Sequence, residues 1–168
     1  MRPSESSVEI VALDPESIDP VSSLLRLNND HATELSYLEP GDLRTMITRA
    51  CVAVRAKDMD AFVLAFDETA DYGSPNFLWF RERFDRFVYV DRICVDPALR
   101  GRGLARRLYE HIFDYARSVG AGRVVCEVNA ELPNPASDAF HASLDFHEVG
   151  SVLLPDRKKR VTYYERRL

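Results

Sequence analysis

Residues 87–105 read FVYVDRICVDPALRGRGLA, and this stretch decides the fold. Residues 87–95 are rich in β-branched and aromatic side chains, a composition that predicts a strand, and Asp96-Pro97 ends that strand. Apolar residues then recur at helical spacing from Leu104 to a stop signal at Gly120, which predicts a helix. The charged pair Asp91-Arg92 interrupts the strand and indicates a bulge, or an opening where a ligand enters.

A second apolar run, Val124–Asn129, predicts another strand after this helix. Strand, helix and strand then form a βαβ unit, whose two strands run parallel. The other predicted elements are strands near residues 8–13, 51–55, 62–66, 147–153 and 161–165, helices near 21–27, 41–49 and 136–144, and a loop with a short helix within 67–86. This order is typical of the α/β class, and the length of 168 residues fits a single domain, residues 1–168.

The net charge of −5 disfavours binding to nucleic-acid phosphates or to an anionic membrane surface. Basic residues gather in residues 157–168, a run typical of a solvated turn and strand end. We find neither an apolar run of membrane-spanning length nor a signal peptide at the first residues, so we expect a cytoplasmic protein. The 3 cysteines and 4 histidines show neither a disulfide framework nor metal-ligand spacing, and no metal is expected.

The loop Arg100–Ala105 lies between the predicted strand and the predicted helix. Its glycines let the backbone approach a ligand closely, and the start of a helix offers unpaired N–H groups and the positive end of the helix dipole. Arginines gather there without an acidic residue, at Arg100, Arg102, Arg106 and Arg107. These features predict a site for phosphate oxygens, the alternative being a solvated helix face. The Gly-Lys-Ser/Thr ending of a P-loop and the Gly-x-Gly-x-x-Gly spacing are both missing.

The loop matches Arg/Gln-x-x-Gly-x-Gly/Ala, and here the chain resembles the GNAT superfamily of acyl-CoA-dependent N-acyltransferases. Residues 134–146, with the pattern N-x-x-S-x-x-F-H-x-x-L-D-F, are similar to the family's Asn-x-x-Ala/Ser-x-x-Phe/Leu-Tyr-x-x-Leu-Gly-Phe segment. The motifs stand in the family's order, and residues 87–150 carry the specific resemblance. The resemblance implies a mixed, twisted sheet of about six or seven strands, with helices on both faces and a parallel pair parted at the acyl-CoA site.

The resemblance also implies acetyl-CoA as the cosubstrate. Backbone groups of Ile93 and Val95 would pair with the pantetheine arm as if it were an added strand, and an N–H near Ile93 or Cys94 would polarise the thioester carbonyl. The pyrophosphate cradle would comprise Arg100, Gly101, Arg102, Gly103, Leu104, Ala105 and Arg106. Asn134 would hydrogen-bond the cofactor arm, although its place before Pro135 is also that of a helix cap.

Acylation of an amine requires a base for the ammonium proton, polarisation of the thioester and support for the departing thiolate. Glu127 lies in an otherwise apolar strand, where burial would raise the pKa of its carboxyl group, and its position matches a glutamate that serves as base in some relatives. The alternatives are a polar residue on an exposed strand face and a rival base at Asp91, unless Asp91 pairs with an arginine. His141 stands where the family often has a tyrosine that protonates the thiolate; it is a candidate acid, or a residue that packs beside the cofactor. Alternative proton donors are Tyr89, Tyr163 and Tyr164.

We therefore expect an N-acetyltransferase that moves an acetyl group from acetyl-CoA to a primary amine of a small molecule or peptide, by direct attack in a ternary complex. Residues 28–38 are expected to form one wall of the acceptor pocket. The resemblance implies a homodimer as a common state of such proteins. The alternative function is a non-catalytic acyl-CoA-binding sensor or regulatory module, and the histidine at position 141 is the feature that favours it.

Overall fold

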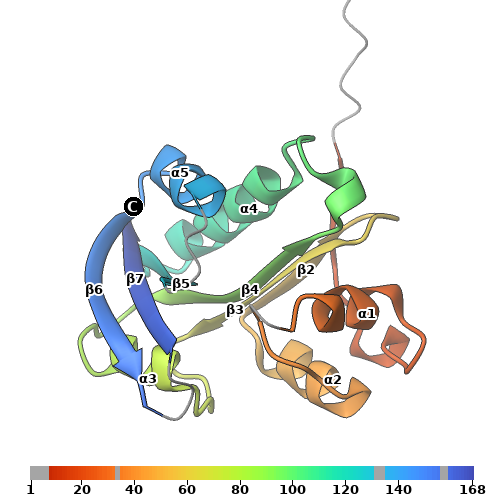
Figure 1. Cartoon of the computed structure of the whole chain (residues 1–168), viewed down its shortest axis with the longest axis horizontal. Helices are drawn as coiled ribbons and strands as arrows, with labels where there is room; N and C mark the ends of the chain where they lie inside the picture. Colours follow the sequence, from red (N-terminus) through yellow and green to blue (C-terminus); the bar gives the residue numbers. More distant parts are fainter. Residues whose placement is uncertain (1–7, 33–34, 131–134, 156–158) are drawn as a thin grey trace, which may run out of the picture.

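The protein is described here from a computed structural model, over residues 8–32, 35–130, 135–155 and 159–168. Within these ranges the strands form one sheet in the order β1-β2-β3-β4-β5-β7-β6 (Figure 1). The strands are β1 (Ile10–Ala12), β2 (Val52–Ala56), β3 (Ala61–Asp67), β4 (Val88–Val95), β5 (Arg123–Asn129), β6 (His147–Leu154) and β7 (Lys159–Arg167). The helices are α1 (Ser23–Asp30), α2 (Pro40–Arg49), α3 (Pro75–Arg81), α4 (Leu104–Ser118) and α5 (Pro135–Ser143), with 3-10 turns η1 (Pro15–Ser17) and η2 (Pro97–Leu99). β4 and β5 are parallel and the other neighbours are antiparallel, so the predicted mixed α/β sheet is confirmed.

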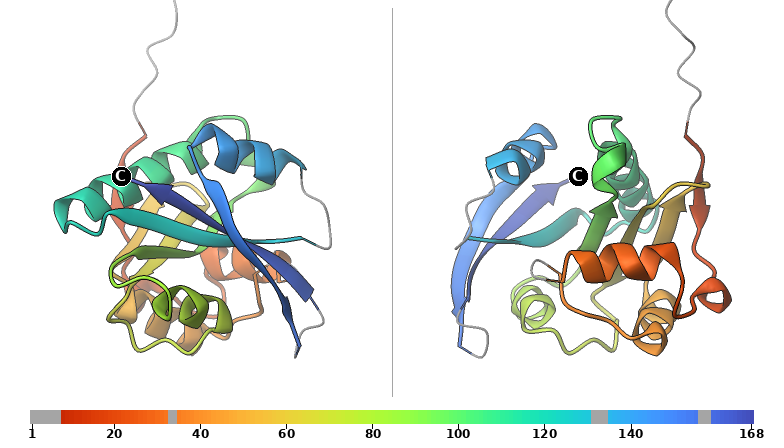
Figure 2. Two further views of the ribbon diagram at one scale, coloured as in Figure 1. Left: turned by 90° about the vertical axis from the view of Figure 1, so that its left-hand side faces the viewer. Right: turned by 45° about the vertical axis from the view of Figure 1, so that its right-hand side comes forward.

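Helices cover both faces of the sheet, α1, α2 and α3 on one side and α4 on the other (Figure 2). Each face has its own hydrophobic core because side chains alternate along a strand. On β3, Phe62, Leu64 and Phe66 enter the core beneath α1 to α3, whereas Ala61, Val63 and Ala65 enter the core beneath α4. The large residues lie opposite three helices and the small ones opposite the single long helix. Among the described residues, no helix is long and apolar enough to cross a membrane.

The parallel strands β4 and β5 diverge soon after they meet (Figure 2). In the described part of the chain they are registered only at Val88 opposite Val124 and Tyr89 opposite Val125. Farther along, β4 stays beside β3 as far as Val95, while β5 pairs with β7 as far as Asn129. The sheet therefore opens between β4 and β5, as the sequence predicted for the parallel pair.

A bulge interrupts β4 at the charged pair. Leu64 of β3 lies opposite Arg92, and the next residue, Ala65, lies opposite Val90, so Asp91 is the extra residue. An extra residue shifts the alternation of side chains along a strand. Asp91 and Arg92 consequently line the same cavity, and the predicted bulge is confirmed.

Candidate active site

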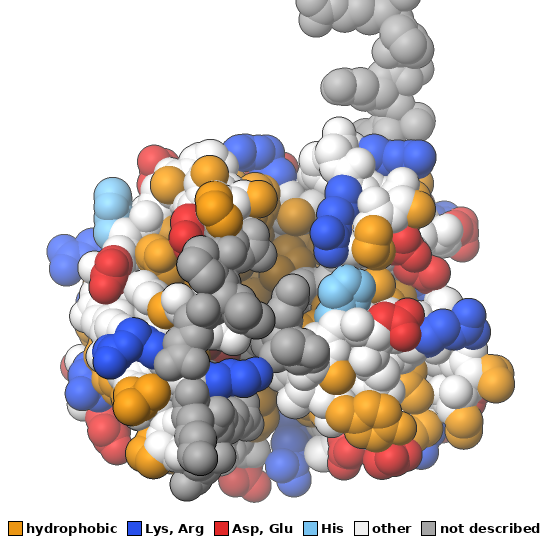
Figure 3. All heavy atoms as spheres, in the orientation of Figure 1, with side chains coloured by type: hydrophobic (Ala, Val, Ile, Leu, Met, Phe, Trp, Pro, Cys, Tyr) orange, Lys and Arg blue, Asp and Glu red, His pale blue; other side chains and the backbone are white. Residues whose placement is uncertain are grey.

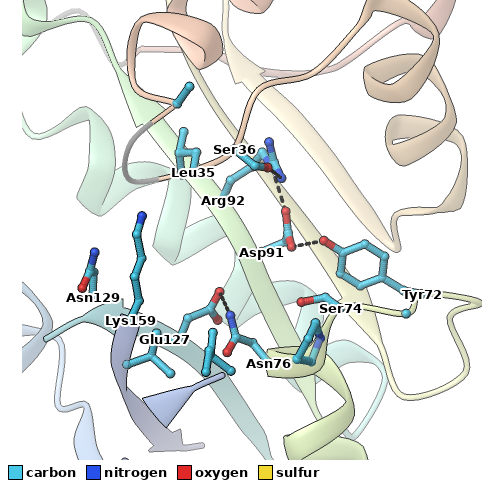
Figure 4. Close-up of a pocket in the computed structure, with 15 residues that line it drawn as sticks. Leu35, Ser36, Tyr72, Ser74, Asn76, Asp91, Arg92, Glu127, Asn129 and Lys159 are labelled. Atoms are coloured by element: carbon cyan, nitrogen blue, oxygen red, sulfur yellow. Dashed lines mark hydrogen bonds and ion pairs between the residues drawn. The ribbon is translucent and has the colours of Figure 1, made fainter. Parts of the chain in front are cut away.

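The opening of the sheet leads into a cavity of about 620 Å³ (Figure 4). Its walls come from β4, β5, β7, the segment that leads into α3, and the segment after α1. Ala32, Leu35 and Ser36 of the segment predicted to border the acceptor line this cavity, and its use by an acceptor stays a prediction. The space-filling view shows a hollow near the centre of this face, with basic side chains at its edge (Figure 3). A concave site of this volume is typical of small-molecule recognition.

Glu127 of β5 lines this cavity and is held through one carboxylate oxygen. Its Oε1 accepts a hydrogen bond from Nδ2 of Asn76 at 3.1 Å (Figure 4) and another from the Tyr89 hydroxyl at 2.8 Å. Its Oε2 is excluded from solvent and has no hydrogen-bond partner among the described residues. Burial, and after it the negative charge of Asp91, raises the pKa of Glu127 to about 8. A carboxyl group with such a pKa can exchange a proton near neutral pH.

Asp91, the rival base, is occupied by an ion pair. Its Oδ2 lies 2.7 Å from Nε of Arg92, its Oδ1 accepts the Tyr72 hydroxyl, and the Asp91 and Arg92 side chains are both 5% exposed. Arg92 also donates to Oδ1 of Asn28 at 2.7 Å. The pair therefore ties the bulge of β4 to the end of α1. Because both oxygens of Asp91 have partners, this geometry favours Glu127 as the base, and the choice between them remains a prediction.

The predicted phosphate site lies at the start of α4, where the loop from Arg100 to Gly103 is exposed. Gly101 and Gly103 have φ of +78° and +75°, and no atom lies within 4 Å of a Cβ built on either. These conformations favour glycine and leave the backbone open to a ligand. The first N–H groups of a helix lack intrahelical partners, so those at the start of α4 are available to an anion.

The arginines around this loop separate into two groups. The side chains of Arg100, Arg102 and Arg106 belong to exposed residues at the start of α4, and Arg106 also donates to the Ser143 hydroxyl at 3.0 Å. Arg107 instead donates to the carbonyl of Val8 at 2.9 Å and so braces the N-terminal segment. The first group can meet a phosphate, and Arg107 is a structural contact.

A smaller cavity of about 60 Å³ connects the loop with β4. Ile93, Cys94, Val95 and Arg100 line it, and Leu35 lines both this cavity and the larger one. Arg100 of the loop therefore lies beside the predicted cofactor residues of β4, and Leu35 separates this smaller cavity from the cavity of Glu127. Asn134, the remaining predicted cofactor residue, lies outside the described residues.

His141 of α5 is buried in an aromatic cluster and uses both ring nitrogens within the protein. Nδ1 lies 2.8 Å from the carbonyl oxygen of Ser137, which can only accept, so Nδ1 carries the hydrogen. Nε2, 3.0 Å from the Tyr109 hydroxyl, is then an acceptor. Burial lowers the pKa of His141, which favours this neutral form. The surroundings favour the packing alternative, and a catalytic role for His141 stays a prediction.

Other candidate groups are engaged or inert. Tyr89 donates to Glu127, Tyr163 donates to Asn76, and burial raises the pKa of the Cys126 thiol, which disfavours a thiolate nucleophile. Among the described residues there is no group of three His, Cys, Asp or Glu side chains arranged to hold a metal ion. Asn76 and Tyr72 were not predicted from the sequence, because residues 72–75 indicate a turn and carry no signal of chemistry.

The buried carboxyl group of Glu127 is expected to make the protein less stable as the pH rises. Its folded-state pKa of about 8 exceeds the ordinary value of 4.5, so the folded state retains a proton that the unfolded state has lost between these values. The free energy of unfolding should therefore fall with pH across this window, by up to about 1.4 kcal/mol per pH unit, and level off above the folded pKa. Denaturant unfolding from pH 5 to 9 should show a steeper fall for the wild type than for Glu127→Gln. Parallel curves would contradict a raised pKa.

Comparison with known proteins places the chain in a family. The sequence profile described as "Acetyltransferase (GNAT) family" matches residues 48–146. The N-alpha-acetyltransferase RimI of Mycobacterium tuberculosis is 43% identical over 61 residues, 36% of this chain and 35% of that protein. Uncharacterized protein ML0378 of Mycobacterium leprae is 39% identical over 61 residues, 36% of this chain and 16% of that protein. The matched segment thus spans about a third or less of these curated relatives.

Solved structures share the fold over nearly the whole chain. The ribosomal-protein-S18-alanine N-acetyltransferase of Escherichia coli has a TM-score of 0.62 at 18% identity, over 95% of this chain and 92% of that chain. The yncA protein of Salmonella typhimurium, solved with acetyl-CoA, has a TM-score of 0.69 at 18% identity, over 97% of this chain and 95% of that chain. The profile match spans more than half of the chain, and the predicted resemblance is confirmed. The chain belongs to the acetyltransferase (GNAT) family.

Proposed function

We propose that the protein transfers the acetyl group of acetyl-CoA to a primary amine by direct attack in a ternary complex. One observation carries the proposal: β4, which borders the opening toward β5, leads at its end to the exposed, arginine-rich start of α4, and its bulge lines a polar cavity whose wall also holds the buried carboxyl group of Glu127. The first part suits the phosphates of a nucleotide cofactor, and the second suits an amine that must lose a proton.

The residues present fit acetyl-CoA, the acyl donor of this family. Its pyrophosphate would lie against the backbone of Gly101 and Gly103, where the open space above both glycines leaves room for it. Arg100, Arg102 and Arg106 supply positive charge at the same place. The pantetheine arm would run along residues 90–95, which have no registered partner in β5 among the described residues. An N–H near Ile93 or Cys94 would then polarise the thioester carbonyl.

The chemistry proposed for Glu127 is removal of one proton from the acceptor. A primary amine is mostly an ammonium ion at neutral pH and cannot attack until it loses a proton. Oε2 of Glu127 takes that proton, directly or through a water, since Oε1 is already bound to Tyr89 and Asn76. The amine nitrogen then forms a bond to the acetyl carbon, and the bond from that carbon to sulfur breaks. The second proton that the nitrogen loses as the amide forms goes to the departing thiolate or to solvent.

The departing group is the thiolate of CoA. A thiol with a pKa near ~8.5 is a good leaving group even without an acid, because its anion is stable close to neutral pH. The proposed reaction therefore proceeds with His141 bound to Ser137 and Tyr109, and the role assigned to His141 by the resemblance is not required.

The acceptor is proposed to be a small-molecule or peptide amine. The cavity of about 620 Å³ has room for more than an amino group, and its wall includes Ser36, Ser74, Asn129 and Lys159. We propose further that the protein works in the cytoplasm, without nucleic-acid or membrane partners. We also propose that it forms a homodimer, a state that is common in the family.

Release of CoA in the presence of amines tests the proposal. Wild-type protein with acetyl-CoA is mixed with lysine, spermidine, an aminoglycoside or a peptide that begins with alanine, and free thiol is measured. We expect one class of amine to speed CoA release by at least about tenfold, with an acetyl group found on that amine by mass spectrometry. Binding of acetyl-CoA without faster CoA release in any class would overturn this function and support the non-catalytic acyl-CoA sensor, the alternative suggested by the histidine at position 141.

A further inference from the structure

Asn76, at the start of α3, is hydrogen-bonded to side chains of two neighbouring strands, β5 and β7. Its Nδ2 donates to Oε1 of Glu127 on β5 at 3.1 Å, and its Oδ1 accepts from the Tyr163 hydroxyl of β7 at 2.9 Å. The residue is 5% exposed, and the Tyr163 ring beyond it is 1% exposed and stacks on Trp79 of α3. Asn76 is thus buried and hydrogen-bonded on both sides; Figure 4 shows its bond to Glu127.

The direction of these bonds fixes the orientation of the amide. An amide nitrogen only donates and a carboxylate oxygen only accepts, so Nδ2 must face Glu127. A reversed amide would place Oδ1 beside the carboxylate oxygen, and two acceptors cannot form a hydrogen bond. The Tyr163 hydroxyl would then face Nδ2 and could no longer donate to Asn76. Tyr89 donates to the same Oε1 from the other side, at 2.8 Å. Both donors therefore act on Oε1, and Oε2 is left without a partner among the described residues.

We propose that Asn76 is a positioning residue for acetyl transfer, which holds Glu127 through Oε1 so that Oε2 receives the proton of the acceptor. The inference rests on the proposed function of Glu127 as the base. α3 and the segment before it also contribute Tyr72, Ser74 and Pro75 to the cavity wall. One short helix between β3 and β4 thus shapes the cavity and orients the base.

The hydrogen bond from Asn76 also bears on the charge of Glu127. Donation to a carboxylate favours its ionised form, so this bond lowers the pKa of Glu127 and opposes the effect of burial. The other ionisable groups around Glu127 are Asp91, Arg92 and Tyr89 on β4, Tyr72 before α3, Cys126 on β5, Tyr109 on α4, and Lys159 and Tyr163 on β7. A variant that changes Asn76 alone leaves all of these in place.

Two variants of Asn76 test the inference. Asn76→Ala removes the donor and should raise the pKa of Glu127 by about one unit. Asn76→Asp keeps the size of the side chain but places a second carboxylate beside that of Glu127, and should raise the pKa of Glu127 further. The pKa is read from the carbon-13 carboxyl signal that is missing in Glu127→Gln. Ser74→Ala is the matched control, because Ser74 precedes α3 and makes no side-chain capping bond; its Glu127 signal should titrate as in the wild type.

The pH profile of acetyl transfer gives the second readout. A raised pKa should cost Asn76→Ala about tenfold in rate at pH 7, and the loss should shrink as the pH rises and ionises Glu127. A residue that merely shaped the cavity would lower the rate equally at every pH. Tyr163→Phe keeps the ring stacked on Trp79 but removes the hydroxyl, so it should shift the profile less and in the same direction. In Asn76→Ala, the additional Tyr163→Phe change should have no further effect on the pKa.

The outcomes separate this inference from the proposed function. If the carboxyl signal shifts in both Asn76 variants but no amine is acetylated by the wild type, Asn76 positions Glu127 and the proposed reaction is wrong. If the wild type acetylates an amine and Glu127→Gln does not, yet neither Asn76 variant moves the carboxyl pKa or the pH profile, the inference is overturned. Equal titration of Glu127 in the wild type, Asn76→Ala and Asn76→Asp would also overturn it.

Discussion

Replacing Glu127 with glutamine is expected to lower kcat for acetyl transfer by about 10²- to 10⁴-fold, the usual contribution of a general base. Glutamine has nearly the same shape, and its amide oxygen can still accept from Tyr89 and Asn76, but it cannot take a proton from an ammonium ion. KM for acetyl-CoA should change little, because the cradle proposed for its phosphates lies at the start of α4. The measurement is steady-state CoA release with the best amine of the panel.

The pH dependence of the wild type belongs to the same prediction. Because the pKa of Glu127 is about 8, the rate should rise with pH and level off above this value. Glu148→Gln is the matched control: Glu148 is an exposed residue of β6, and its loss should leave the rate and profile unchanged. If the Glu127→Gln protein keeps the wild-type rate and pH profile, Glu127 is not the base, and Asp91 becomes the candidate base.

Replacing Gly103 with glutamate is expected to abolish binding of acetyl-CoA, with at least a hundredfold rise in Kd, equivalent to about 2.7 kcal/mol. Gly103 has φ of +75°, a conformation that costs a residue with a side chain roughly 1–2 kcal/mol. The new side chain would enter the open space above the loop and place a carboxylate where the pyrophosphate should lie. Like charges there oppose binding, whatever the arginines contribute.

Gly122→Glu separates this effect from backbone strain. Gly122 has the same φ of +75° and equally open surroundings, but it lies just before β5, at the other end of α4. Both variants should lose similar stability in denaturant unfolding. Only Gly103→Glu should lose acetyl-CoA binding in equilibrium dialysis. Equal binding by the two variants would show that the loop does not hold the cofactor.

The strand, loop and helix of residues 87–120 could be predicted because their signals are local. Strand composition, the glycines after Arg100 and the stop at Gly120 each act within a few residues. The bulge at Asp91 was predictable for the same reason, since two charges in an apolar strand disturb its pairing. The ion pair of Asp91 with its own neighbour Arg92 was only an alternative, because the sequence does not show which way the side chain of the extra residue points.

The support of Glu127 could not be predicted, because it depends on the order of strands. β5 pairs with β7 along its whole length but, among the described residues, with β4 only at Val124 and Val125, and Glu127 lies beyond that contact, where Asn76 at the start of α3 reaches it. Asn76 lies 51 residues before Glu127 in the chain, and Tyr163 lies 87 residues after Asn76. No spacing rule joins positions so far apart. The orientation of His141 was equally hidden, since its partner Tyr109 lies on a different helix.

The opening between β4 and β5 is proposed to bind acetyl-CoA. Thermal unfolding of the wild-type protein with increasing acetyl-CoA tests this binding. At ~100 times Kd, binding should stabilise the folded state by roughly 2.7 kcal/mol and raise Tm by several degrees, with further increases at higher concentration. Folded Gly103→Glu measured alongside should show no shift. A wild-type Tm that stays constant up to millimolar acetyl-CoA would contradict the claim, and the acetyltransferase function proposed for this site would fall with it.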